Sequence, residues 1–339
     1  MKSTYDPIGL YSLAKPLLFQ ISPEKAHKLS LRALGIAGYF SLTRKLLQYM
    51  FSPSNNPTPL LGKTFSNRIG MAAGYDKNAQ ALDGLESMGF GHIEVGTITP
   101  KPQKGNPYPR VHRLPQESAL VNRLGFPNDG LDIIANRIES YCERRNKRHS
   151  ASRPILGINI GKNKITPNEE ASLDYKECFE RLKDFADYIA INVSSPNTPN
   201  LRDLQSEEEL EKILMPILDI RAQSSSRVPI LVKLSPNLPH DSRTHMIHKL
   251  TEWNVDGVIL SNTTKTVQPW EGGKSGAPLH DETLALIKQT RKSFPDIVII
   301  ASGGIGMDGD LKTFVEAGAD LIQIWTALVY RGPNLLRRL

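Results

Sequence analysis

Cysteine is scarce in this chain. Of its 339 residues only Cys142 and Cys178 carry a thiol, and neither lies in a C-x-x-C pair or another spacing typical of metal ligands. The sequence therefore excludes a disulfide-stabilised scaffold and predicts two reduced thiols in a cytosolic chain. The eight histidines form no H-E-x-x-H or similar motif, so we expect no bound metal.

Long apolar runs are missing as well. The chain has no stretch of eighteen apolar residues, which excludes an ordinary transmembrane helix. We expect no secretion signal, because Asp6 and Pro7 interrupt the first residues before an apolar centre can form. With 39% hydrophobic and 23% charged residues, the composition is typical of a soluble globular protein with a substantial core.

Charge is unevenly distributed along the chain. The net charge is +7, and residues 1–50 hold seven Lys or Arg against two acidic residues, which places most of the excess there. Such an excess suits an anionic substrate, a nucleic acid or a membrane surface. The same segment carries an apolar stripe at helical spacing. This stripe comprises Leu10, Leu13, Ala14, Leu17 and Leu18.

Two further helices are predicted in this segment. Ser22 followed by Pro23 predicts a helix start, because serine caps helix N-termini and proline fits the first helical position. Apolar residues between Leu42 and Met50 predict a third, short helix. We expect residues 1–55 to form an amphipathic helical unit. The patterns leave two interpretations open: a cap packed on the rest of the protein, or a unit that dips its apolar faces into an anionic membrane.

The remainder of the chain, residues 60–339, alternates short apolar runs with amphipathic helical stretches. Runs without polar alternation are typical of parallel strands that are covered on both faces. Eight such alternations over roughly 250 residues predict a TIM (β/α)8 barrel of the α/β class. The predicted strands are Ile69–Ala73, His92–Gly96, Ile155–Asn159, Tyr188–Asn192, Ile230–Lys233, Gly257–Asn262, Ile297–Ser302 and Leu321–Trp325.

Two connections in this barrel are too long for a single helix, residues 97–154 and 193–229, and long βα loops usually build the site or its lid. The second begins with Ile191–Asn200, where serines, asparagines and a threonine stand between two prolines. Polar groups concentrated where a strand ends are typical of binding and catalysis, because the carboxyl ends of barrel strands share the functional face.

Hydrogen-bonding or charged groups follow every predicted strand. Gly303-Gly304 after the seventh strand favours a phosphate, because backbone N–H groups can approach it closely there. Lys77 and Lys233 end the first and fifth strands and could meet an anionic substrate and a reduced cofactor ring, or could extend from the barrel rim into solvent. Amides at Asn122, Asn192, Asn197 and Asn262 suit a flat ligand with alternating C=O and N–H edges.

These residues, in this order, resemble the dihydroorotate dehydrogenases of pyrimidine biosynthesis, specifically the membrane-associated class 2 enzymes that use a quinone. The matching blocks are Ala73–Lys77, Gly96–Pro100, Asn122–Phe126, Gly157–Asn163, Asn192–Asn197, Ser261–Thr264, Gly272–Gly276 and Ser302–Ile305. Class 1 relatives use cysteine as the base and lack the helical extension, whereas this chain has Ser195 and the extension.

The resemblance implies FMN at the barrel mouth and a set of residue roles. Matches to the family's flavin contacts are Ala73, Gly74, Tyr75, Asp76, Lys77, Thr97, Asn159, Asn192, Lys233, Ser261, Gly276, Gly304, Trp325 and Thr326. Matches to its substrate contacts are Lys77, Asn122, Arg123, Leu124, Gly125, Phe126, Asn192, Asn197, Asn262 and Thr263. Ser261 stands where threonine is common, and Trp325 where tyrosine is usual.

The implied reaction is oxidation of dihydroorotate to orotate. Ser195 matches the catalytic base that takes the C5 proton, while C6 passes hydride to the flavin. Because a serine hydroxyl is a weak base, we expect a proton path through Thr198 and a water. His27 and Arg113 match residues that border the quinone tunnel. Ubiquinone or menaquinone would reoxidise the flavin, and the resemblance moves the N-terminal unit toward peripheral contact with the cytoplasmic face of the inner membrane.

Alternatives predict different features. A flavin barrel that reduces uridine in RNA, like the tRNA-dihydrouridine synthases, predicts an RNA-binding domain and a basic stripe facing the site; here the excess charge precedes the barrel. A soluble class 1 dehydrogenase and a membrane-attached binding module without catalysis are further alternatives. We expect dihydroorotate, a quinone and an anionic membrane as partners, no nucleic acid, and a monomer.

Overall fold

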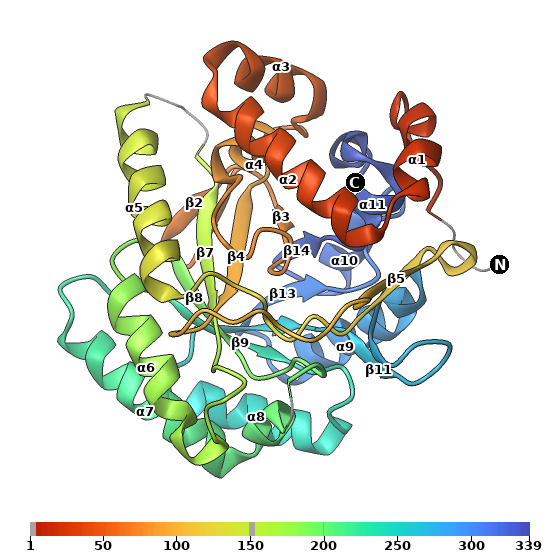
Figure 1. Cartoon of the computed structure of the whole chain (residues 1–339). Helices are drawn as coiled ribbons and strands as arrows, with labels where there is room; N and C mark the ends of the chain where they lie inside the picture. Colours follow the sequence, from red (N-terminus) through yellow and green to blue (C-terminus); the bar gives the residue numbers. More distant parts are fainter. Residues whose placement is uncertain (1–4, 149–152, 199) are drawn as a thin grey trace.

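The structure is a computed structural model that describes residues 5–148, 153–198 and 200–339. Its centre is a closed barrel of parallel strands in the order β10-β13-β14-β3-β4-β7-β8-β9 (Figure 1). The barrel strands are β3 (Ile69–Met71), β4 (His92–Ile98), β7 (Ile155–Ile160), β8 (Tyr188–Asn192), β9 (Ile230–Leu234), β10 (Gly257–Leu260), β13 (Val298–Ser302) and β14 (Leu321–Ile324). All eight predicted strands are confirmed, and pairing of β14 with β3 closes the ring.

Helices lie outside the barrel, between successive strands and after the last one (Figure 1). They are α4 (Leu82–Ser87), α5 (Leu131–Lys147), α6 (Ala171–Leu182), α7 (Glu207–Gln223), α8 (His240–Glu252), α9 (His280–Ser293), α10 (Asp310–Glu316) and α11 (Thr326–Arg331). Local chemistry explains the start of one of them, α7. Ser206 caps α7 by accepting the N–H of Glu209, and three glutamates in the first turn complement the helix dipole.

The two ends of the barrel interior differ. At the amino ends of the strands, apolar side chains including Phe65, Leu231 and Ile300 fill the interior. A hairpin of β1 (Thr58–Leu60) and β2 (Lys63–Phe65) contributes to this layer. The bottom of the barrel is therefore a packed core, as in other barrels of this type, and a ligand can enter only at the opposite end.

A second sheet that the sequence analysis did not predict stands at the other end. Its strands run in the order β11 (Thr264–Thr266), β12 (Gly272–Gly276), β6 (Ala119–Asn122) and β5 (Val111–Leu114). They come from the long connections after β4 and β10, and every pairing in this sheet is antiparallel. The predicted long loop 97–154 therefore builds a wall beside the barrel mouth.

Three helices precede the barrel, as predicted: α1 (Tyr11–Gln20), α2 (Pro23–Tyr39) and α3 (Ser41–Phe51). Ser22 and Pro23 start α2, although the serine side chain makes no capping hydrogen bond. Helix α2 packs so closely against α4 that a Cβ added at Gly38 would lie 2.4 Å from Gly84 N. The extension is thus seated on the barrel, yet eleven of the seventeen exposed large apolar side chains in the described residues belong to residues 10–49.

None of the helices in the described ranges combines the length and apolarity that crossing a bilayer demands. The exposed apolar residues of the extension lie on all three helices. They are Leu10, Leu13, Leu17, Ile21, Leu29, Ile36, Tyr39, Phe40, Leu42, Leu46 and Tyr49. Much of the predicted stripe on the first helix therefore faces away from the barrel core, and we call these eleven residues the exposed apolar face.

Candidate active site

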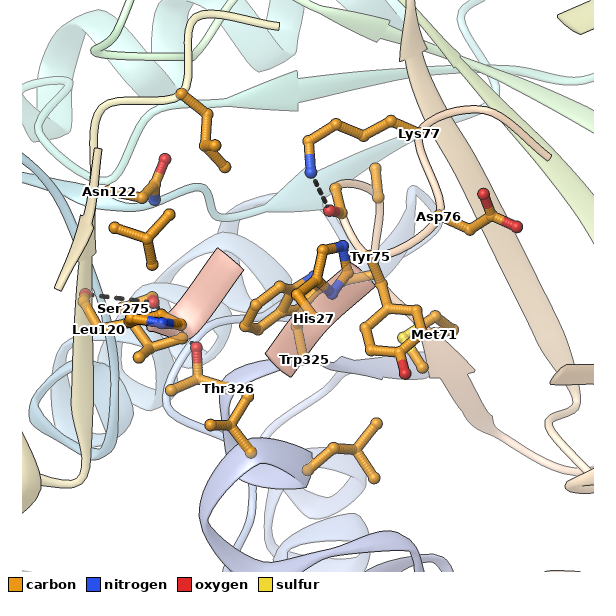
Figure 2. A pocket seen from close by; sticks show the side chains of 18 of the residues that line it. His27, Met71, Tyr75, Asp76, Lys77, Leu120, Asn122, Ser275, Trp325 and Thr326 are labelled. Atoms are coloured by element: carbon orange, nitrogen blue, oxygen red, sulfur yellow. Dashed lines mark hydrogen bonds between the residues drawn. The ribbon is translucent and has the colours of Figure 1, made fainter. Parts of the chain in front are cut away.

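A cavity of about 750 Å³ lies between the carboxyl ends of the barrel strands, the second sheet and helices α1 and α2. This volume is ordinary for a small-molecule site, for which roughly 300–1,000 Å³ is typical. Figure 2 shows Lys77 and Asn122 on opposite sides of the cavity, with His27 and Trp325 between them. One continuous space therefore joins the barrel mouth to the helical extension.

Nearly all of the predicted site residues line this cavity, including Lys77, Ser195 and Lys233. The predicted positions among its lining residues are His27, Ala73, Gly74, Tyr75, Asp76, Lys77, Thr97, Arg113, Asn122, Leu124, Gly125, Phe126, Asn192, Ser195, Asn197, Lys233, Ser261, Asn262, Thr263, Gly276, Gly304, Trp325 and Thr326. Three predicted residues, Arg123, Asn159 and Thr198, are not among them.

The structure separates two of the predicted contacts from the ligand space. Successive side chains of a strand point to opposite faces, so Asn122 at the end of β6 faces the cavity while Arg123 is exposed and donates to Pro109 O at 3.4 Å. Asp76 lines the cavity, but its carboxylate accepts the N–H groups of Asn78, Gln80 and Ala81 at 3.2, 3.0 and 2.7 Å. That carboxylate secures the turn into α4, and Figure 2 shows it pointing away from the cavity.

Lys77 supplies positive charge at one side of the cavity. Its ammonium group donates to Gly74 O. Burial and, to a smaller extent, the positive charge of Arg110 lower the pKa of Lys77 to about 8, against the opposing effect of Asp76 and Glu24. Arg110 is itself held by Glu24 of α2 at 3.0 Å. The lysine is therefore a cation at neutral pH that can lose its charge in mildly alkaline solution.

The loop after β8 places its polar groups against the second sheet. Ser195 is buried, and its Oγ accepts the N–H of Asn197 at 3.3 Å. The Asn197 amide donates to Asn122 Oδ1 at 3.0 Å, which ties this loop to β6. Thr198 is also buried, and its hydroxyl finds no partner in the described part of the chain. A lone hydroxyl three residues beyond Ser195 is available to bind a water.

Beside the buried Lys233 lies a buried carboxylate that the sequence analysis did not single out. Glu94 on β4 is fully buried and lies 3.9 Å from the ammonium group of Lys233. Burial lowers the pKa of Lys233, and Glu94 raises it. A glutamate in the middle of a buried strand is itself a signal, because acidic residues are almost never fully buried unless they are paired.

The loop after β13 forms a cradle of backbone donors. Gly303 and Gly304 have φ angles of +119° and +76°, which glycine adopts without strain. Asp310 Oδ2 accepts the N–H groups of Gly306 and Met307, each at 2.7 Å, and so holds the loop from behind. The same carboxylate lies in the first turn of α10, which begins at Asp310.

The half of the cavity beneath the extension is mainly apolar. His27 of α2 contacts Tyr75 edge-on, with ring centroids 5.1 Å apart, and lies 5.8 Å from Trp325. Burial lowers the pKa of His27 to about 3, so the imidazole is neutral. Arg113 lies over the Phe19 ring at 4.5 Å and donates to Ile21 O at 2.8 Å. Its buried Nε has no partner among the described residues.

Comparison with known proteins decides the family. The sequence profile of the family described as dihydroorotate dehydrogenase matches residues 57–339. The chain belongs to the dihydroorotate dehydrogenase family. A relative from Xanthomonas campestris pv. campestris (strain B100), called dihydroorotate dehydrogenase (quinone), is 43% identical over 96% of this chain and 94% of its own length. A relative of the same name from Albidiferax ferrireducens is 43% identical over 97% and 96%.

Solved structures agree with this assignment. A dihydroorotate dehydrogenase from Eimeria tenella in complex with ferulenol has a TM-score of 0.85 and 34% identity, covering 94% of this chain and 89% of that chain. The ligand-free form from the same organism gives the same TM-score and identity. Dihydroorotate dehydrogenases are oxidoreductases of flavin type that act in pyrimidine biosynthesis, and the predicted family and fold are both confirmed.

Proposed function

We propose that this chain oxidises dihydroorotate to orotate, with FMN as its bound cofactor and a membrane quinone as the electron acceptor. The observation that carries the proposal is the single cavity that gathers Lys77, Ser195 and Lys233 at the barrel mouth and continues beneath the helical extension. Family membership and the quinone-dependent relatives support the reaction.

The residues present fit FMN. Neither Gly304 nor Ile305 donates its backbone N–H to an acceptor in the described ranges, which leaves these donors for a phosphate. A Cβ added at Gly74 would meet nothing within 4 Å, so this backbone borders open space. Bound here, FMN would supply the two-electron chemistry that takes hydride from the substrate and passes the electrons to the quinone. Lys233 would hold positive charge against the isoalloxazine ring.

Substrate binding falls to the polar side of the cavity. Lys77 would pair with the carboxylate of dihydroorotate, and the amides of Asn122, Asn197 and Asn262 would meet the edges of its ring. Analogues without those edges would cover these amides without pairing them and would bind poorly. The role of Arg123 as a side-chain contact is the weakest of the predicted assignments, because its guanidinium group faces solvent.

Ser195 would remove the proton from C5 of the substrate. A serine needs an acceptor for its own proton, and we propose Thr198 with a bound water in this role. The support is the buried and unpartnered Thr198 hydroxyl on the same loop. We expect Thr198→Val to slow reduction of the flavin by dihydroorotate in stopped-flow absorbance, and an unchanged rate would remove Thr198 from the mechanism.

The apolar half of the cavity would admit the quinone. A neutral His27 and aromatic walls suit an uncharged ring, and the buried, unpartnered Nε of the half-buried Arg113 can donate to a quinone carbonyl. We propose that the helical unit within residues 1–55 guides the quinone from the membrane to the FMN-binding barrel of residues 60–339. The exposed apolar face, flanked by lysines and arginines, supports peripheral contact with the anionic cytoplasmic face of the inner membrane.

Membrane contact is tested by sedimentation with vesicles. We expect the full chain to pellet with vesicles that contain anionic lipid and to be released when Leu13 and Leu17 are both replaced by glutamine. Equal pelleting of the parent and the double variant would contradict a role for this face. The expected monomer stays a prediction that sedimentation equilibrium would test.

The absorbance spectrum of the purified protein tests the proposed function directly. We expect oxidised flavin bands that bleach when dihydroorotate is added anaerobically and return when a soluble quinone analogue follows. A protein without flavin bands, or with bands that dihydroorotate leaves unchanged, would contradict the proposal. Bleaching without recovery by quinone would retain the oxidation and refute the acceptor.

A further inference from the structure

The buried carboxylate of Glu94 stands where a barrel interior otherwise becomes apolar. It lies within the barrel, above the apolar layer at the bottom and below the ligand cavity. Three donors point at it: Asn159 Nδ2 at 2.9 Å to Oε1, and Tyr188 Oη at 2.9 Å and Gln323 Nε2 at 2.7 Å to Oε2. Gln323 also donates to Tyr188 Oη at 3.4 Å, so the tyrosine proton is directed at Glu94. Surrounded by donors, Glu94 acts as an acceptor only.

An acceptor at this position fixes how the neighbouring amides are oriented. An asparagine or glutamine side chain can exchange its oxygen and nitrogen by a half-turn, and only its hydrogen-bond partners decide between the two states. Because Glu94 takes the NH2 groups of Asn159 and Gln323, both carbonyl oxygens must point elsewhere. Gln323 lines the cavity, and its Oε1 has no partner in the described ranges.

The orientation of Asn159 is passed on toward the substrate side. Asn159 Oδ1 accepts from Thr97 Oγ1 at 2.6 Å and from Asn192 Nδ2 at 3.2 Å. The oxygen of Asn192 then accepts from Ser194 Oγ at 3.1 Å, and Ser194 Oγ accepts from Asn262 Nδ2 at 2.9 Å. Each bond in this series has a direction that follows from the one before it.

Lys233 is the second group that depends on Glu94. The lysine is buried, and Glu94 is the charged group that faces it, at 3.9 Å. Two other titratable groups lie near the carboxylate. Tyr188 of β8 donates to it, and the ring of His92, on β4 like Glu94, packs against Tyr188. Without Glu94, burial alone would act on the ammonium group and favour its neutral form.

We propose that Glu94 is a positioning residue that sets the hydrogen-bond direction of the amides around the ligand and keeps Lys233 positively charged. It touches neither substrate nor cofactor in this role. The inference rests on the proposed function, because the amides and Lys233 matter through the flavin and the orotate that they bind. The structure of the network itself stands on the contacts above.

Glu94→Gln tests the inference in the FMN-loaded protein. A glutamine must turn an NH2 group toward Asn159 or toward Tyr188 and Gln323, so one donor faces another, and the charge beside Lys233 is lost. We expect orotate, titrated by its perturbation of the flavin spectrum, to bind about tenfold more weakly. We also expect the alkaline limb of the pH profile of flavin reduction to move about one pH unit toward acid.

Two further variants separate positioning from mere stability. Glu94→Asp keeps the charge but withdraws it from both Asn159 and Lys233, because the same Oε1 faces each of them. We therefore expect weaker orotate binding and an acid shift of the alkaline limb that is smaller than in Glu94→Gln. Tyr188→Phe removes one donor on the opposite oxygen and leaves the Asn159 series in place, so we expect orotate affinity within twofold of the parent. A purely structural role predicts that all three variants lose thermal stability without moving the pH profile.

The outcomes decide cleanly. If the parent fails to bind orotate, the proposed function falls before the variants are compared. If the parent binds and Glu94→Gln shows parent affinity and pH profile, the inference about Glu94 is overturned while the proposed function stands. If Glu94→Gln does not accumulate as folded protein, Glu94→Asp decides: weaker orotate binding together with an acid-shifted alkaline limb supports the inference, and parent affinity or the parent pH profile overturns it.

Discussion

The two halves of the cavity differ in chemistry although they share one space. The barrel half is lined by carboxamides, serines and the ammonium groups of Lys77 and Lys233, whereas the extension half is built mainly from apolar side chains of α1 and α2, with the neutral imidazole of His27 and the guanidinium group of Arg113. A polar anion and an apolar quinone need opposite surroundings. The side chains that line each half can therefore keep flavin reduction by dihydroorotate apart from flavin reoxidation by quinone. We expect a substitution in one half to change one of these steps and to leave the other unchanged.

Ser195→Ala gives the largest expected effect and acts on the barrel half. Loss of a positioned base typically slows proton transfer by about 10²–10⁴-fold. We expect flavin reduction by dihydroorotate, followed by stopped-flow absorbance, to slow by this amount, while a quinone reoxidises dithionite-reduced protein at the parent rate. Full-rate reduction in the variant would remove Ser195 from the mechanism. Slowing of both reduction and reoxidation would show that the two halves of the cavity do not act independently.

Arg113→Met acts on the extension half. Its free Nε is the donor expected to meet the quinone carbonyl, and losing a charge-assisted hydrogen bond costs about 1.5–3 kcal/mol, or roughly 10–100-fold. We expect slower reoxidation by quinone and unchanged reduction by dihydroorotate. Arg113→Lys is the matched control, since it keeps the charge but loses the forked donors. Its rate of reoxidation by quinone should lie between those of the parent and of Arg113→Met. Slowed reduction by dihydroorotate in either variant would contradict the independence of the two halves of the cavity.

Lys77 makes the affinity of the barrel half for orotate depend on pH. Its pKa is lowered to about 8 by burial, and the protonated form is the one that attracts an anion. Below pH 8 the affinity for orotate should be constant, and above it the affinity should fall about tenfold per pH unit. We expect Lys77→Met to bind weakly with no such dependence. A parent affinity that stays level to pH 10 would show that Lys77 does not pair with the anion.

His280 gives the smallest expected effect and concerns the support behind the glycine cradle. Hydrogen bonds to Asp310 and Asp281 at 3.1 and 2.9 Å raise the pKa of His280 to about 9. Because the folded pKa lies above the unfolded value of about 6.5, this stabilisation is full below pH 6.5 and is lost as the pH rises through about 9.

The histidine is half-buried, so solvent screening limits the effect to about 1 kcal/mol. We expect thermal unfolding of the flavin-loaded protein to occur at lower temperature at pH 9.5 than at pH 6, by about one to two degrees. His280→Gln should reduce that difference. An equal difference in the variant would place the pH dependence elsewhere.

How far the sequence could be interpreted differed between these regions. The barrel strands were predictable because strands covered on both faces are continuous apolar runs, and all eight lie where those runs do. The residues of the cavity were found because they follow these runs and match family motifs. Their functional roles stay predictions.

Other features could not be predicted from the sequence. The second sheet is made of short strands such as Val111–Leu114, whose residues are all half-buried and show no clear pattern. The orientation of Arg123 depends on strand register, and the bonds of the Asp76 carboxylate depend on the turn that follows it. The charge of Glu94 could be noticed in the sequence, but its partners come from three other strands and meet only when the barrel closes.

Tyr5 has a practical consequence for anyone who shortens this chain. It precedes all three helices of the extension, yet it is buried beside the barrel, where its N–H donates to Ser118 Oγ at 2.8 Å and its hydroxyl donates to Gly304 O. Truncating the protein to its barrel in search of a membrane-free form would therefore remove a hydrogen bond that supports the glycine loop after β13. Replacing the outward-facing leucines of the extension, and leaving Tyr5 in place, is the better engineering route.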